Sequence, residues 1–305
     1  MDLAIVGLGK IAKDQHLPAV ADSAFFSLAA IVDQRAVDVG VPVFGSIEDL
    51  VASGFRGAVA ICTPPAARFD IARVALEAGL HTLLEKPPGL ATSEVDQLAD
   101  LARRNVVTLF AAWHSREAAM VAPAKAFLTD RQVRDVAISW REDIRRWHPG
   151  QNWILDKGGF GVFDPGINAL SILTEIVPGA HRVESCLLEI PQGRASPITA
   201  QLALRLANGS SAAADLDFTE TDEQVWEIRV QTDAEELVLA DGGARLMIGG
   251  NPVPPSPGPG EYVRLYERFR QLVENEQSDA DSAPLALVED ALRVGRRESV
   301  AAFAF

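Results

Sequence analysis

Short apolar runs alternate with amphipathic segments along the first third of the chain. The apolar runs have the length and composition of buried strands, and the segments between them carry apolar residues at helical spacing. Strands that alternate with helices predict parallel pairing through right-handed crossovers. The predicted strands are Asp2–Val6, Ser27–Val32, Ala58–Cys62, Leu80–Leu84 and Val106–Phe110, and the predicted helices are Lys10–Ala21, Ile47–Ala52, Phe69–Ala78 and Ser93–Arg104. Pro18 is expected to end or kink the first of these helices.

The remainder of the chain shows a different pattern, in which strand-like runs follow one another with short turns. Such a series predicts an antiparallel sheet. A long run at Val133–Ile144 comes first, followed by one helical pattern at Ile167–Ile176. The later predicted elements are strands at Arg182–Ile190, Ile198–Arg205, Ser211–Phe218, Val225–Gln231, Leu237–Leu239 and Leu246–Ile248, a loop at Asn251–Gly260, and helices near Tyr262–Asn275 and Leu285–Phe303.

The two patterns predict an α/β protein of two domains, because 305 residues exceed what one core usually serves. We assign residues 1–115 to a doubly wound parallel sheet that binds a dinucleotide. Residues 116–305 are assigned to an α+β domain with a mostly antiparallel open sheet that binds the substrate. The C-terminal helix of the chain is expected to pack back on the first domain.

Composition and charge narrow the possible partners. The formal net charge of −14 disfavours binding to nucleic acid and to anionic membrane surfaces. Cys62 and Cys186 lie far apart, and the five histidines show no metal-ligand spacing, so we expect buried thiols and no metal. The chain shows no leader pattern and no apolar run long enough to cross a bilayer. These features predict a cytoplasmic enzyme.

A glycine motif marks the predicted dinucleotide site. The sequence GLGKIA at residues 7–12 directly follows the first strand and opens the first helix. Gly7 permits the tight turn, Gly9 lets the backbone approach a pyrophosphate, and the helix N-terminus offers free N–H donors. Asp33 ends the second strand, where a carboxylate accepts hydrogen bonds from ribose and repels a 2′-phosphate. The pattern is typical of a Rossmann domain and favours NAD over NADP, although Arg35 could soften that preference.

Several further motifs together resemble the Gfo/Idh/MocA oxidoreductase family. They are the glycine motif, Thr63-Pro64 after the predicted third strand, the run ALEAGLH at residues 75–81, and Glu85-Lys86-Pro87. Carboxyl ends of parallel strands line the ligand crevice of such a sheet, where a lysine can stabilise negative charge on a reacting oxygen. The cofactor is therefore expected to contact Gly7, Gly9, Lys10, Ile11, Asp33, Cys62, Thr63, Pro64, Glu85 and Lys86.

Later segments are similar to the aldose 1-dehydrogenase branch of that family, whose members act on L-arabinose or D-galactose. These segments are WHS at residues 113–115, EDIRRWHPGQ at 142–151 and GVFDPGINALS at 161–171. The resemblance implies oxidation of the anomeric carbon of a small sugar to an aldonolactone, with NAD as the cofactor and NADP as the alternative. It also implies a homodimer formed through the outer face of the antiparallel sheet.

The same resemblance assigns the catalytic residues. The wider family carries an Asp and, four residues later, a His; this chain has Asp164 and Asn168 at those positions. Because asparagine cannot accept a proton, the role of base falls to Asp164, with Lys86 in support. Two positions four apart on a helix share a face, so both side chains can enter one pocket. The alternative for Asp164 is a helix N-cap followed by Pro165.

Aromatic and polar side chains are interleaved in one stretch of the second part. Sugars need polar groups for their hydroxyls and flat apolar surfaces for their C–H faces. Core packing is the alternative for each tryptophan. The predicted substrate residues are His114, Glu142, Trp147, His148, Asp164, Asn168 and Trp226.

Two other functions compete with this interpretation. A dehydrogenase of the same family could act on a different sugar position or on an inositol. The chain could also be a regulatory protein that binds NAD(P) without catalysis, because a fold alone never establishes an activity. The joint presence of Lys86 and Asp164 favours an enzyme, since a sensor needs neither.

Overall fold

The computed structural model describes the chain except for residues 36–38, 256 and 305. The described chain divides into two compact units, each of which is described by itself. The first unit comprises residues 1–114 and 259–282, and the second comprises residues 115–258 and 283–305. Within the described ranges, no helix is both long and apolar enough to span a membrane.

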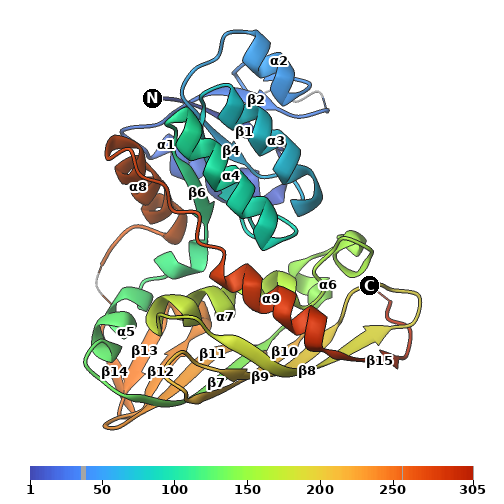
Figure 1. The fold of residues 1–305 in the computed structure, drawn as a ribbon, viewed down its shortest axis with the longest axis vertical. Coiled ribbons are helices and arrows are strands. Elements are labelled where there is room, and N and C mark those ends of the chain that lie inside the picture. The colour runs from blue at the N-terminus through green and yellow to red at the C-terminus, as the bar shows by residue number, and fades with distance from the viewer. Residues whose placement is uncertain (36–38, 256, 305) are drawn as a thin grey trace. The chain divides into compact units, whose positions relative to one another are not determined.

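The first unit contains a parallel sheet of six strands in the order β3-β2-β1-β4-β5-β6 (Figure 1). This order places the first strand in the middle of the sheet and confirms the predicted doubly wound Rossmann topology. The sequence patterns did not predict the short strand β3, which lies at one edge of the sheet. The strands are β1 (Asp2–Val6), β2 (Ser27–Val32), β3 (Val43–Phe44), β4 (Ala58–Ile61), β5 (His81–Glu85) and β6 (Leu109–Ala112).

Helices cover both faces of this sheet, and the alternation of side chains along β1 shows how. Leu3 and Ile5 face a core shared with α1 and α8, whereas Ala4 and Val6 face a core shared with α2, α3 and α4. Both faces are apolar because both are buried. The helices are α1 (Leu17–Ala21), α2 (Ile47–Ala52), α3 (Pro65–Glu77), α4 (Thr92–Asn105) and α8 (Glu261–Glu274).

Two elements of the first unit differ from their predicted form. The predicted helix Lys10–Ala21 contains a π-helical turn at Ala12–His16 before α1 begins. Pro18 lacks an N–H and crowds the preceding turn, which accounts for an irregular helix at this point. The sixth strand begins later than predicted, because Val106 takes a left-handed conformation with φ of 55° that ends α4.

The second unit contains a sheet of nine strands in the order β14-β13-β12-β11-β7-β10-β9-β8-β15. Most neighbouring strands are antiparallel, as predicted, but β7 pairs with β10 and β8 with β15 in parallel. The strands are β7 (Val133–Arg141), β8 (Arg182–Pro191), β9 (Thr199–Arg205), β10 (Ser211–Asp217), β11 (Val225–Thr232), β12 (Leu237–Ala240), β13 (Arg245–Ile248), β14 (Asn251–Val253) and β15 (Arg296–Val300).

Helices pack on one face of this second sheet, on the side where Figure 1 shows α5, α7 and α9. The strands alternate accordingly: along β9, Leu202 and Leu204 are buried, whereas Gln201 and Ala203 are exposed on the other face. The helices are α5 (Val121–Leu128), α6 (Ile144–Trp147), α7 (Phe163–Ile176) and α9 (Ala283–Val294), with short 3-10 turns at His114–Glu117, Asn152–Leu155 and Asp241–Gly243.

The C-terminal part of the chain corrects three predictions. The predicted helix Leu285–Phe303 is the helix α9 followed by the strand β15. A Cβ atom at Gly295, between α9 and β15, would lie 2.7 Å from Leu188 of β8, so this close approach requires glycine. The predicted loop Asn251–Gly260 begins with strand β14. The predicted single boundary near residue 115 misses that α8 belongs to the first unit.

Candidate functional site

The glycine motif forms a tight turn at the carboxyl end of β1. Gly7 has φ of +88° and donates its N–H to the carbonyl of Val32 at 2.8 Å. A Cβ atom at Gly7 would lie 2.9 Å from Cγ2 of Thr63, so the turn requires glycine. A Cβ at Gly9 would meet nothing within 4 Å, which leaves open space beside the backbone. This is the form of turn that brings a pyrophosphate to a helix N-terminus.

Asp33 lies directly beyond β2 and is already engaged on both carboxylate oxygens. Its Oδ2 accepts the N–H of Leu8 at 2.8 Å, and Arg35 donates from Nε to Oδ1 at 2.9 Å and from Nη2 to Oδ2 at 3.0 Å. The Arg35 guanidinium holds the pKa of Asp33 well below its usual value, so the carboxylate stays charged. Asp33 is nearly buried, whereas 67% of the Arg35 side chain is exposed.

Thr63 supplies a polar atom without a partner beside the glycine turn. Its Oγ1 is buried and has no hydrogen bond within the part of the chain that the structure describes. Cys62 and Pro64 flank it at the carboxyl end of β4, where the Rossmann crevice lies. An unsatisfied hydroxyl is costly unless a ligand completes it. The open space at Gly9 and this hydroxyl together fit a bound dinucleotide.

The loop after β5 is held from two sides around Lys86. The N–H of Lys86 donates to Oε2 of Glu85 at 2.8 Å. Arg68, which received no role from the sequence, donates from Nη1 to the carbonyl of Glu85 at 2.7 Å and also to that of Pro87. Its Nε reaches the carbonyl of Thr63 at 2.8 Å. Arg68 thus ties the end of β4 to the loop that carries Lys86.

The remaining predicted cofactor residues, Lys10 and Ile11, lie at the start of the first helix. The Lys10 side chain is 67% exposed and pairs with Asp14 one turn further on. Ile11 packs against the core beneath the sheet. Neither side chain is arranged as a ligand here, and their backbone N–H groups are the atoms that a helix N-terminus presents to an anion.

Asp164 and Asn168 lie one turn apart on α7 in the second unit. Asp164 is the second residue of this helix and Val162 is its N-cap, so the alternative of an Asp164 cap is wrong. Gly161 precedes the helix with φ of +55°, and a side chain there would overlap the carbonyl of Pro197. This constraint fixes how the helix begins and therefore where Asp164 lies. The Asp164 side chain is 11% exposed, and Asn168 is half-buried.

His148 lies between two carboxylates in the same unit. Its Nε2 is 3.4 Å from Oε1 of Glu142, and its Nδ1 is 3.8 Å from Oδ2 of Asp164. His148 ends the short helix α6, Glu142 directly follows β7, and Asp164 comes from α7, so three elements converge. The ring of His148 also packs edge-on against Phe218, with 5.5 Å between ring centroids. We call Glu142, His148 and Asp164 the acid–histidine cluster.

Two tryptophans lie beside the acid–histidine cluster. Trp226 donates from Nε1 to Oε2 of Glu142 at 2.7 Å. Trp147 lies edge-on to Trp226 with ring centroids 5.5 Å apart, bonds to Gln224, and is 42% exposed. Trp140 and Trp113 are buried, which is the core role weighed for each tryptophan. The structure therefore brings together five predicted substrate residues: Glu142, Trp147, His148, Asp164 and Trp226.

His114, also predicted to bind substrate, belongs to the first unit. Its Nδ1 lies 3.0 Å from Oε2 of Glu261, and its ring stacks on Tyr262 at 5.3 Å between centroids. Both partners are on α8, a helix that was not predicted to take part in the site. The structure thus shows His114 as part of an aromatic contact between the 3-10 turn after β6 and α8.

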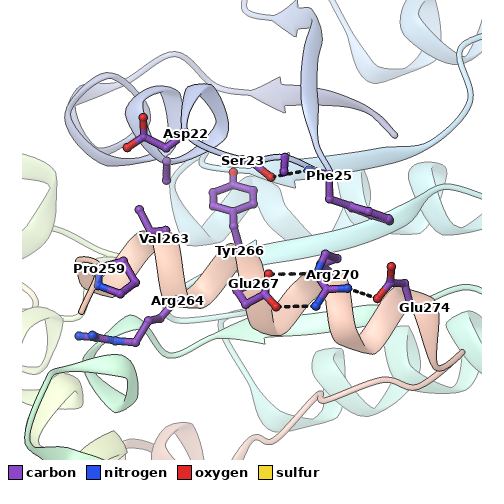
Figure 2. A pocket seen from close by; sticks show the side chains of 12 residues that line it. Asp22, Ser23, Phe25, Pro259, Val263, Arg264, Tyr266, Glu267, Arg270 and Glu274 are labelled. Atoms are coloured by element: carbon purple, nitrogen blue, oxygen red, sulfur yellow. Dashed lines mark hydrogen bonds and ion pairs between the residues drawn. The ribbon is translucent and has the colours of Figure 1, made fainter. Parts of the chain in front are cut away.

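A hollow of about 600 Å³ lies between α8 and the turn after α1 (Figure 2). Three of its charged side chains are paired, because Arg270 bonds to Glu267 and Glu274 on the same helix. Within the described residues, its lining includes none of the predicted cofactor or substrate residues. The hollow is therefore separate from both parts of the candidate site.

Comparisons with known proteins point in one direction. Residues 1–112 match the model of the oxidoreductase family with an NAD-binding Rossmann fold, Gfo/Idh/MocA. The chain is 39% identical to galactose 1-dehydrogenase of Pseudomonas fluorescens over 302 residues, which cover 99% of this chain and 98% of the relative.

Solved structures agree with that match. The crystal structure of a D-galactose 1-dehydrogenase from Rhizobium etli is 45% identical, covers 99% of this chain and 97% of its own, and superposes with a TM-score of 0.94. A 3-ketoreductase from Actinomadura kijaniata, solved with NADP, is 16% identical with a TM-score of 0.86 over 98% of this chain and 99% of its own. This last likeness shows the shared fold alone.

Proposed function

Because the chain belongs to the Gfo/Idh/MocA oxidoreductase family, we propose that it is an aldose 1-dehydrogenase that uses NAD or NADP. Its substrate is D-galactose or L-arabinose, and its product is the aldonolactone. The similarity to galactose 1-dehydrogenases over nearly the whole chain supports the class of substrate. The observation that carries the proposal is the acid–histidine cluster with Trp147 and Trp226 beside it.

The acid–histidine cluster suits the recognition of a cyclic sugar. Glu142, His148 and Asp164 present carboxylate oxygens and ring nitrogens that can bind neighbouring hydroxyls. The Trp147 face offers a flat apolar surface for the C–H groups of the sugar ring. Trp226 holds Glu142 in place by donating a hydrogen bond from its indole N–H. A site of this mixed character distinguishes sugars by the orientation of their hydroxyls.

We assign Asp164 as the acceptor of the anomeric hydroxyl proton. It is a nearly buried carboxylate whose Oδ2 lies 3.8 Å from Nδ1 of His148. Asn168, one turn further on α7, donates or accepts a hydrogen bond but takes no proton. Lys86 keeps the role predicted from the sequence, which is to stabilise negative charge on the reacting oxygen.

The cofactor is held by residues of the first unit. The glycine turn at Gly7 and Gly9 would receive the pyrophosphate, Thr63 Oγ1 would gain its missing partner, and Asp33 with Arg35 would meet the adenosine ribose. When bound, the nicotinamide supplies the hydride acceptor for the anomeric carbon. The protein contributes position, charge and proton transfer.

An assay of cofactor reduction tests this function. Absorbance at the reduced nicotinamide band is followed with NAD or NADP against D-galactose, L-arabinose, D-glucose and myo-inositol. We expect turnover with galactose or arabinose and far less with myo-inositol. Silence with every sugar, in a protein that binds the reduced cofactor, would favour the non-catalytic alternative. Preference for myo-inositol would favour another dehydrogenase of the family.

A further inference from the structure

A group of buried polar side chains in the first unit lies outside the roles assigned so far. His16, Glu85, Tyr262 and Tyr266 are each at most 6% exposed, although all four side chains are titratable. His16 comes from the π-helical turn after the glycine motif, Glu85 from the end of β5, and both tyrosines from α8. We call these four residues the α8 network. A core needs none of these polar atoms for its stability.

Both ring nitrogens of His16 and both carboxylate oxygens of Glu85 have a hydrogen-bond partner. His16 Nε2 lies 2.9 Å from Oε1 of Glu85, and His16 Nδ1 lies 2.8 Å from the hydroxyl of Tyr266. The hydroxyl of Tyr262 donates to the same Oε1 of Glu85 at 2.7 Å. The other carboxylate oxygen, Oε2, accepts the N–H of Lys86 at 2.8 Å. A buried pair is tolerable only when its hydrogen bonds are completed in this way.

The directions in which the pKa values of His16 and Glu85 are shifted indicate an ion pair between them. Burial opposes the charge on His16, but Cys62, Tyr266 and Glu85 favour it and raise the pKa of His16 well above its usual value. Burial likewise opposes the charge on Glu85, but His16, and then His114 and Arg68, lower the pKa of Glu85. The two directions agree, so both groups are charged near neutral pH.

The placement of Tyr262 and Tyr266 explains why α8 belongs to the first unit. They are four residues apart and lie on one face of the helix, which also packs Phe269 against Phe26. Figure 2 shows Tyr266 extending from α8 with its hydroxyl end directed away from the helix. Both rings also meet His16 edge-on, with centroids 5.0 and 5.7 Å away. A helix from the C-terminal part of the chain therefore touches the residue before Lys86.

We infer that the α8 network positions Lys86 for the reaction. Glu85 is the link, because one carboxylate oxygen binds the backbone of Lys86 and the other is fixed by His16 and Tyr262. Arg68 holds the carbonyls on either side of Lys86, so the loop is restrained at three points. His16, Glu85, Tyr262 and Tyr266 are positioning residues that act through Lys86. This inference rests on the proposed dehydrogenase function.

Two variants test the α8 network by kinetics. Glu85→Gln removes the ion pair, and a small displacement of a reacting group can cost up to about 100-fold in rate. We expect kcat per cofactor-binding site to fall about 10- to 100-fold, with KM for the sugar and Kd for NADH changed less than about 3-fold. Tyr266→Phe removes one hydroxyl and should lower kcat about 2- to 10-fold. If Glu85→Gln does not fold, Tyr266→Phe decides.

Thr82→Val is the matched control. Thr82 is fully buried on β5, and its hydroxyl donates to the carbonyl of Leu80, outside the α8 network. Its loss should lower the melting temperature and leave kcat per cofactor-binding site unchanged. The inference is overturned if Glu85→Gln and Tyr266→Phe keep the kcat of the Thr82→Val protein, or if their losses appear in KM alone.

A measurement without substrate separates this inference from the sugar assignment. Nitrogen NMR of the histidine-labelled protein at pH 8 should show one ring, absent in His16→Gln, with both nitrogens protonated. A neutral His16 ring would overturn the ion pair even if sugars are oxidised. An imidazolium with no turnover of any sugar would contradict the proposed function and leave the ion pair in place.

Discussion

Among single residues, Asp164 has the central chemical role, because we assign it as the proton acceptor. It lies in the first turn of α7 with His148 3.8 Å away, and its side chain is 11% exposed. As a nearly buried carboxylate beside His148, it is the residue to which we assign the proton of the anomeric hydroxyl.

The substitution Asp164→Asn keeps the shape of the side chain and removes its basicity. We expect kcat to fall about 100- to 10,000-fold, the usual cost of losing a general base. Binding of NADH, measured by its fluorescence, should stay as it is. Asp156→Asn is the control, because Asp156 is a half-exposed carboxylate paired with Arg194 in the same unit. Near-normal turnover of Asp164→Asn would refute the assignment.

Asp33 and Arg35 form an ion pair at the predicted ribose position. Asp33 alone predicts a preference for NAD, but the structure shows the guanidinium of Arg35 bound to both of its oxygens. An exposed arginine beside the ribose position can also bind a 2′-phosphate. The pair therefore predicts that the protein can use either cofactor.

The substitution Arg35→Ala should shift the choice of cofactor toward NAD. We expect kcat/KM for NADP to fall about 10-fold or more, because a charge-assisted contact is lost, and kcat/KM for NAD to change little. Arg56→Ala, at an exposed arginine that bonds only to the neighbouring Phe55 carbonyl in the described chain, serves as the control. An unchanged ratio of the two values would show that Arg35 has no part in the choice.

At the scale of elements, the α8 network joins the π-helical turn, β5 and α8 through one buried ion pair. The pKa of His16 is raised, so its contribution to stability is complete below 6.5 and declines as the pH rises toward its pKa in the folded protein. The pKa of Glu85 is lowered, so its contribution is complete above 4.5 and declines as the pH falls. The pair therefore stabilises most between these two values.

The free energy of unfolding should accordingly decline above pH 6.5. The expected slope is up to about 1.4 kcal/mol per pH unit, which is the value of one pKa unit. Urea denaturation from pH 5.5 to 8.5 measures it. The His16→Gln protein should be less stable at pH 6 and should lack the part of the decline that His16 causes. Equal slopes in the two proteins would mean that His16 is neutral in the fold.

The sequence predicts elements better than it predicts their partners. The buried strands of the first sheet are continuous apolar runs, so five of its six strands follow from the alternation with helices, whereas the two-residue edge strand β3 does not. The periodicity of residues 262–275 predicts a helix with one apolar face, but not which sheet that face covers. His16 and Tyr266 are 250 residues apart, and no local pattern links them.

For the candidate site, too, the sequence predicts individual residues better than it predicts their contacts. Residue types and the family resemblance select Glu142, His148 and Asp164 individually, and their contact depends on the turn at Gly161 and on pairing between strands. Arg68 was given no role, because it precedes the predicted helix Phe69–Ala78 and an arginine usually points to solvent. Its bonds to the two carbonyls beside Lys86 exist only once β4 and β5 are neighbours.

At the scale of the whole molecule, a homodimer stays a prediction. The outer face of the second sheet presents Ser139, Gln201, Ala203 and Asp215, which are short or polar side chains. An interface there would be flat and more polar than a typical permanent one.

Sedimentation should give about twice the chain mass of 32.7 kDa if this face joins two copies. Ala203→Arg places a long charged side chain in the middle of the face and should yield monomers. Ala122→Arg, on an exposed position of α5, should leave the dimer intact. A monomeric wild-type protein, or a dimeric Ala203→Arg protein, would exclude this interface.

The carbon that loses its hydride decides whether the protein is an aldose 1-dehydrogenase. D-Galactose labelled with deuterium at C1 is incubated with the protein and NAD, and the reduced cofactor is analysed by mass spectrometry. Oxidation at the anomeric carbon predicts one deuterium on each reduced nicotinamide and a lactone as the product. Unlabelled reduced cofactor, with a ketosugar oxidised at another carbon such as C3, would contradict the assignment of an aldose 1-dehydrogenase.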